Sequence, residues 1–180
     1  THIAFPGESN GLLPLRSKWR DVERAALSYG YGLSVSAVQL AQAYAVIAND
    51  GVKVPLTLKK VNGVPQGEQV IGKATARQLV QMLETVVSRV GTARRAQVPG
   101  YQVAGKTGTV HKVMAGGYAD DNYIGLFAGL APATDPRIVT VVVIDDPGGD
   151  AYYGGLVAAP AFSNIMGLSL IHISEPTRRP

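Results

Sequence analysis

The chain has 180 residues, of which 46% are apolar and 17% are charged, and this composition excludes an intrinsically disordered protein. Its net charge of +4 comes from basic residues scattered along the chain, which argues against a nucleic-acid-binding face. The absence of cysteine excludes disulfides, thiolate metal sites and a cysteine nucleophile.

The amino-terminal part of the chain predicts a loop followed by two helices. Residues 1–20 contain proline and glycine at short intervals, which is typical of a loop. Residues 21–30 predict a short helix. Residues 36–49 have a broad apolar face at helical spacing, with Ser36 as the expected N-cap and Gly51 just beyond the end.

The middle of the chain predicts a further helix and several strands. Residues 54–61 alternate between apolar and polar and predict a strand. Residues 74–91 predict a helix, because their apolar side chains recur at helical spacing and a glycine follows. Three strands are then predicted over residues 101–110, 122–132 and 137–146.

The connections between these strands indicate the fold class. A polar loop is expected at residues 114–121, whereas the last two strands are close enough to form a hairpin. Residues 152–166 predict a closing helix, with Pro160 as the place for a kink. Helices followed by adjacent strands predict an α+β fold with an antiparallel sheet, in one domain over residues 1–167. Residues 168–180 resemble the translation of a sequencing-library adapter, so we expect a non-native tail there. We find no apolar run long enough to cross a bilayer.

The stretch "GYQVAGKTGTV" at residues 100–110 fits two motifs that imply different chemistry. Gly100, Gly105, Lys106 and Thr107 match the phosphate-loop pattern of nucleotide-binding proteins. Asp145 and Asp146, at the end of an apolar strand, would then be candidates to hold magnesium. That motif requires a buried strand before it and a helix after it, and neither is predicted here. A nucleotide site is therefore the less favoured interpretation.

The alternative motif is K-T-G, formed by Lys106, Thr107 and Gly108. A strand presents Lys106 and Gly108 on one face and Thr107 on the other. The ammonium group gives positive potential, the hydroxyls of Thr107 and Thr109 can bind a carboxylate, and Gly108 lets a substrate backbone approach. The backbone N–H of Thr109 can stabilise an oxyanion. An ordinary strand with an exposed lysine fits the triad equally well when it is taken alone.

Sequence segments longer than the triad show a more specific resemblance to a known family. The chain resembles the carboxy-terminal part of the transpeptidase domain of class B penicillin-binding proteins, most closely the division-specific type. The matching segments occur in the family's order over residues 3–167: "FPGES", "LPL", "WRDVERAALSYGYGLSVSAVQLAQAYAVIANDGV", "GYQVAGKTGT", "FAGLAPATDPRIVTVVVID" and "YYGGLVAAPAF".

The resemblance implies a five-stranded antiparallel sheet flanked by helices and a serine that forms an acyl-enzyme with D-Ala-D-Ala peptides or β-lactams. It makes Lys106, Thr107, Gly108 and Thr109 catalytic residues. It places Tyr152 and Tyr153 near the rim as substrate-binding residues, although plain packing of these rings explains them as well. No metal or organic cofactor is implied, and the expected partners are the peptidoglycan stem peptide, β-lactams and other division proteins, with no nucleic acid.

The other two motifs of the family are missing from this chain. No serine has lysine three residues later or asparagine two residues later, so neither S-x-x-K nor S-x-N is present. We expect both motifs, and a membrane anchor, to precede Thr1 in a parent protein at the periplasmic face of the bacterial inner membrane. The chain alone is expected to be inactive. A relative that has lost catalysis and serves as a scaffold is the remaining alternative. His111 follows the triad and is interpreted as a surface histidine.

Overall fold

The structure, a computed structural model, describes residues 3, 5–63, 65–114 and 117–174. Four α-helices, one 3-10 helix (η1) and five strands are found in these residues. In chain order they are α1 (Asp21–Ser28), α2 (Ala37–Ala48), β1 (Val52–Lys53), β2 (Glu68–Gln69), α3 (Lys73–Val87), η1 (Arg94–Ala96), β3 (Ala104–Met114), β4 (Gly117–Ala131), β5 (Ile138–Asp145) and α4 (Gly154–Ser174).

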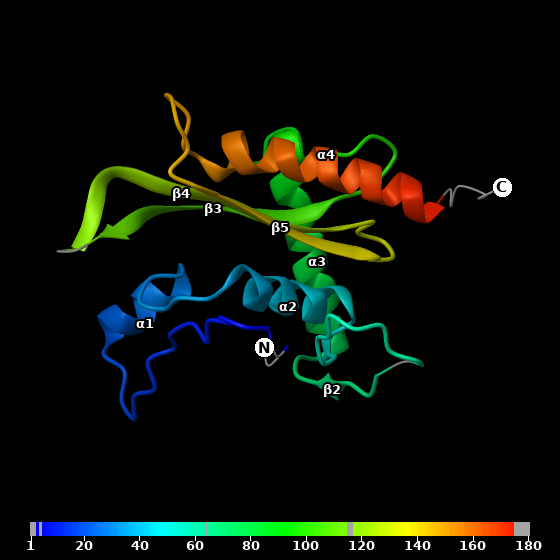
Figure 1. The fold of residues 1–180 in the computed structure, drawn as a ribbon, viewed down its shortest axis with the longest axis horizontal. Coiled ribbons are helices and arrows are strands. Elements are labelled where there is room, and N and C mark those ends of the chain that lie inside the picture. Colours follow the sequence, from blue (N-terminus) through cyan, green and yellow to red (C-terminus); the bar gives the residue numbers. More distant parts are fainter. Residues whose placement is uncertain (1–2, 4, 64, 115–116, 175–180) are drawn as a thin grey trace.

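The centre of the fold is an antiparallel sheet with the strand order β3-β4-β5. In Figure 1, α4 lies on one face of this sheet and α2 on the other, while α3 packs beside β3. The predicted α+β fold with an antiparallel sheet is therefore confirmed. The described residues supply three strands of this sheet, and the short strands β1 and β2 pair separately.

Alternating residues of β4 build an apolar core on each face of the sheet. Phe127 meets Phe162 of α4 edge-to-face, with the ring centroids 4.7 Å apart, and Met166 and Leu170 complete the buried cluster. On the opposite face, Leu130 packs in a second cluster with side chains from α2 and α3. Each fully buried apolar side chain contributes roughly 1.5–3 kcal/mol, so this alternation holds both helical layers on the sheet.

The termini of α2 follow the sequence closely. The Ser36 hydroxyl accepts from the backbone N–H of Gln39 at 3.2 Å, and the Gln39 side chain accepts from the Ser36 N–H at 2.8 Å. This reciprocal cap satisfies two N–H groups that the helix cannot pair internally. Gly51, with φ of 87°, takes the left-handed conformation after the helix. In contrast, α3 ends at Val87, and Gly91 lies beyond a further turn.

Two sequence predictions about strands are wrong. Residues 54–61 form no strand, because Pro55 cannot donate to a ladder and no described strand pairs with them. Residues 114–121 are not simply a polar loop, since β3 and β4 run into this stretch and pair up to Met114 and Gly117. Residues 115 and 116 of that predicted loop lie outside the described residues.

The closing helix α4 is longer than predicted, because it continues through residues 168–174 of the expected tail and buries Leu170. Pro160 lies inside it. The expectation that no segment is long and apolar enough to cross a bilayer is also wrong, since Gly154–Ile173 meets both criteria. One face of this helix packs on β4 and β5, but only 28% of the apolar window is buried, and Leu168 is 63% exposed.

Candidate active site

The K-T-G residues lie in the middle of a strand. Lys106 pairs with Ala128 and Thr109 pairs with Gly125 in the antiparallel ladder between β3 and β4. The predicted strand is confirmed, and the phosphate-loop interpretation is wrong, because no helix begins at Lys106. Among the described strands, β3 has only β4 as a neighbour, so its outer edge is not paired.

The two aspartates that could have served a nucleotide site make other contacts. The carboxylate of Asp145 forms an ion pair with Lys112 at 2.9 Å, which raises the pKa of that lysine through a hydrogen bond. Asn122 donates to both carboxylate oxygens of Asp146, at 2.9 and 3.0 Å. Both carboxylates therefore stabilise the sheet margin, and the described residues contain no cluster of metal-ligating side chains.

A cavity of about 280 Å³ opens beside the K-T-G strand. Thr107 and Thr109 share one face of the strand, as its period of two requires, and both side chains line the cavity. The Nζ atom of Lys106 lies 2.9 Å from the carbonyl oxygen of Thr107 and 3.3 Å from its Oγ1, and donates to both. The positive charge of the lysine is thus directed at the threonine hydroxyl.

The amino terminus of α4 closes the same cavity. The backbone N–H of Gly154 donates to Thr109 Oγ1 at 3.0 Å. Because the oxygens of Thr107 and Thr109 already accept hydrogen bonds, their own hydroxyl hydrogens can be donated to a ligand. The cavity offers two hydroxyl donors and the positive end of a helix, and the ammonium of Lys106 contacts Thr107 Oγ1 from outside the lining; these groups favour an anion such as a carboxylate.

Tyr152 and Tyr153 have different surroundings. Tyr152 stacks on Tyr123 with the ring centroids 4.0 Å apart, and its hydroxyl donates to that of Tyr153 at 3.3 Å. This hydrogen bond and the neighbouring Tyr153 raise the pKa of Tyr152 to about 12. Only Tyr153 lines the cavity beside Thr107, and it is 56% exposed. Tyr152 packs on Tyr123 and Tyr153 lines the cavity, and the substrate-binding role expected of both stays a prediction.

Sequence reasoning missed two residues near this site. Tyr123 is the cross-strand partner of His111, and the two rings tilt together with centroids 4.6 Å apart. His111 is half-buried and packs on Tyr123, which in turn stacks on Tyr152. The predicted surface histidine therefore has an aromatic neighbour. Thr92 lies in the segment between α3 and η1 and lines the cavity with Thr107. No motif marks Thr92, and only the fold brings it to the K-T-G strand.

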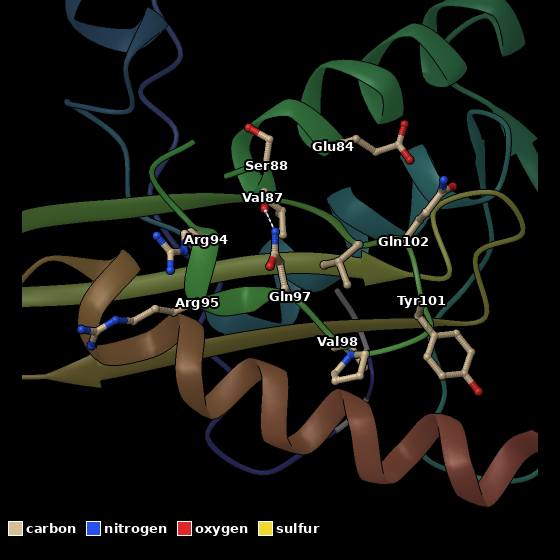
Figure 2. A pocket seen from close by; sticks show the side chains of 11 residues that line it. Glu84, Val87, Ser88, Arg94, Arg95, Gln97, Val98, Tyr101 and Gln102 are labelled. Atoms are coloured by element: carbon tan, nitrogen blue, oxygen red, sulfur yellow. Dashed lines mark hydrogen bonds between the residues drawn. The ribbon is translucent and has the colours of Figure 1, made fainter. Parts of the chain in front are cut away.

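A larger hollow of about 610 Å³ lies between the end of α3, η1 and the start of β3 (Figure 2). Gln97 crosses it and donates from Nε2 to the carbonyl oxygen of Val87 at 3.0 Å. Figure 2 shows the side chains of Arg94 and Arg95 pointing away from Glu84. The charged groups do not converge, and the hollow therefore lacks the arrangement found beside Thr107.

Comparisons with known proteins agree with this geometry. The profile of the family described as penicillin binding protein transpeptidase domain matches residues 1–167. The chain is 48% identical over 174 residues to the probable peptidoglycan D,D-transpeptidase PbpC of Pseudomonas aeruginosa, covering 97% of this chain and 31% of that protein. It is 44% identical over 167 residues to the peptidoglycan D,D-transpeptidase FtsI of Escherichia coli, covering 93% of this chain and 28% of that protein.

Solved structures show the same relationship. The apo TP domain from Burkholderia pseudomallei penicillin-binding protein 3 superposes with a TM-score of 0.89 at 45% identity, covering 99% of this chain and 54% of that one. The chain therefore belongs to the family of penicillin-binding protein transpeptidase domains. It spans 28–31% of the length of the two curated relatives and about half of the solved domain.

Proposed function

We propose that this chain forms one side of the acylation site of a serine-type peptidoglycan D,D-transpeptidase, which also binds β-lactams. The observation that carries the proposal is that Thr107, Thr109 and the first turn of α4 line one cavity, while Lys106, which is not among the lining residues, donates to Thr107 Oγ1. A D-Ala-D-Ala peptide ends in a carboxylate close to its scissile amide, and penicillins carry a carboxylate beside the lactam. The cavity offers donors of the kind that both ligands need.

Each residue has a distinct role in this proposal. The ammonium of Lys106 supplies positive potential, and the hydroxyls of Thr107 and Thr109 hold the carboxylate. Gly108 is proposed to leave the strand backbone accessible to the substrate, although the Cβ that a side chain would add there meets Leu126 at 2.9 Å. The backbone N–H of Thr109 is one oxyanion donor, which stabilises charge in the transition state. Tyr153 contacts the substrate at the rim of the cavity. Tyr152, which stacks on Tyr123, supports Tyr153 through the hydrogen bond between their hydroxyls.

The nucleophile must come from elsewhere in the parent protein, because no serine of this chain stands in an S-x-x-K sequence. We infer that a preceding segment carries S-x-x-K and S-x-N, together with a membrane anchor that holds the site at the periplasmic face of the inner membrane. Residues 1–167 would then be the carboxy-terminal portion of the domain and residues 168–180 a non-native tail. The family match ends at residue 167, whereas α4 continues to Ser174 and the alignment with PbpC covers 97% of the chain. The stem peptide and other division proteins are the proposed partners, and the proposed chemistry uses no cofactor.

Penicillin acylation of the full-length parent protein tests the proposal. Lys106→Ala is expected to slow acylation on the order of 10²–10³-fold, because electrostatic stabilisation in the site is lost. Lys112→Ala is the matched control, since Lys112 lies on the same strand but pairs with Asp145 at the sheet margin. Its acylation rate should stay close to that of the wild type.

The three possible failures are distinct. A wild-type parent that penicillin does not label would contradict the enzymatic proposal and favour a non-catalytic scaffold. Equal rates for Lys106→Ala and wild type, with unchanged circular dichroism spectra, would contradict the role of Lys106. Equal losses for Lys106→Ala and Lys112→Ala would indicate a general disturbance of β3.

A further inference from the structure

Thr92 contacts the K-T-G strand across fifteen residues of sequence. Its Oγ1 lies 3.2 Å from Oγ1 of Thr107, and either hydroxyl can be the donor. Both side chains line the cavity of about 280 Å³ beside the strand. Thr92 comes from the segment between α3 and η1, so this contact is independent of the pairing between β3 and β4.

Backbone contacts of Thr92 and of the residue after it fix the position of Thr92. The N–H of the next residue, Ala93, donates to the carbonyl oxygen of Val86 at 2.9 Å, and the Ala93 side chain is fully buried. The carbonyl oxygen of Thr92 lies against Gly155 of α4, where an added Cβ would come within 2.1 Å of it. A side chain at residue 155 would therefore displace Thr92, and glycine permits the close approach.

The hydrogen bonds of Thr107 show what Thr92 can do. Lys106 Nζ donates to Thr107 Oγ1, which leaves that hydroxyl one further acceptor site and its own hydrogen. Without a ligand, Thr107 can donate its hydrogen to Thr92. When a carboxylate binds, Thr107 turns its hydrogen to the carboxylate, and Thr92 can donate to Thr107 in return. Thr107 thus keeps a partner in both states.

We propose that Thr92 is a positioning residue for carboxylate recognition, because it holds the Thr107 hydroxyl in the orientation that donates to the ligand. This inference rests on the proposed transpeptidase function of the parent protein. Thr92 itself does not have to touch the substrate. Its effect should therefore appear only with ligands that engage the Thr107 hydroxyl through a carboxylate.

The test compares penicillin with its methyl ester, which lacks the anionic group, on the full-length parent protein. Acylation rates are measured by intact mass spectrometry for wild type, Thr92→Val and Thr92→Ser. Valine keeps the shape of threonine without the hydroxyl, and serine keeps the hydroxyl. We expect Thr92→Val to slow acylation by penicillin about tenfold, the equivalent of about 1.4 kcal/mol. Thr92→Ser should stay within about twofold of wild type, and the ester should react equally with all three proteins.

A parallel loss for penicillin and its ester would overturn the inference, since a merely structural role lowers both rates. An unchanged rate for Thr92→Val, or a loss in Thr92→Ser as large as in Thr92→Val, would overturn it as well. Should the valine variant fail to fold, Thr92→Ala carries the same comparison. A wild-type parent that penicillin does not acylate would instead overturn the proposed function, and the inference with it.

Discussion

Gly154, the first residue of α4, is a position where a single methyl group should disturb the site. It lies over the paired residues Gly108 and Leu126 of β3 and β4. A Cβ at residue 154 would come within 2.3 Å of the carbonyl oxygen of Leu126 and 2.5 Å of that of Gly108. Real Cβ atoms do not approach other atoms so closely, so Gly154→Ala must push α4 away from the sheet or distort the K-T-G strand.

The size of the effect follows from what the methyl group meets. Overpacking usually costs roughly 1–3 kcal/mol, and flexible side chains lower that cost by moving aside. Both obstacles here are backbone oxygens of paired strands, which cannot rotate away. We therefore expect a loss of about 3 kcal/mol, which lowers the melting temperature by about 4 °C in a domain about twice the length of this chain, as the solved domain is. Because Gly154 also donates to Thr109, we expect acylation to fall on the order of 10²-fold.

Thermal unfolding and penicillin acylation of the full-length parent protein measure both effects. Gly148→Ala is the matched control, because no atom lies within 4 Å of the Cβ that it adds in the loop before α4. It should leave both quantities near their wild-type values. If Gly154→Ala melts at the same temperature as the control, α4 does not press on the two strands and the argument is refuted.

Three further predictions concern the pH dependence and the isolated chain. Tyr153→Phe should lower the pKa of Tyr152 from about 12 towards 10.0, as measured by phenolate absorbance. Because folding raises this pKa, the contribution of Tyr152 to the free energy of unfolding is complete below pH 10.0 and is lost as the pH rises through about 12. Hydrogen bonds from Arg77 and Lys73 lower the pKa of Asp50 below its ordinary value of 3.8, so its stabilisation is present above that pH and is lost as the pH falls through the lowered value. In urea unfolding, Asp50→Asn should therefore have a lower free energy of unfolding than wild type at pH 7, and the difference between the two proteins should narrow below pH 3.8. A difference that stays constant with pH would contradict this account. The isolated chain should express poorly, because an apolar groove of about 450 Å³ lies open between α2 and β5. The isolated chain should also form no covalent band with fluorescent penicillin. A band that unlabelled penicillin abolishes would show that the chain contains a nucleophile.

The sequence alone determined the elements whose signals are local. The cap at Ser36 and the apolar spacing after it predict α2 within a residue of its observed bounds, because both depend on neighbours three or four positions away. The alternating residues around Lys106 predict a strand for the same reason. Residues 54–61 alternate in the same way but form no strand, because a strand needs a partner and proline removes a donor.

Only the tertiary structure decided which side chains meet at the cavity. Thr107 and Thr109 were recognisable from the K-T-G pattern, but Thr92 carries no motif and reaches Thr107 through the turn that follows α3. Tyr152 and Tyr153 are adjacent in sequence, yet one packs on Tyr123 and the other lines the cavity. Local patterns record the preferences of a chain segment for helix or strand. Contacts between distant segments depend on strand register and helix packing, which short-range spacing does not contain.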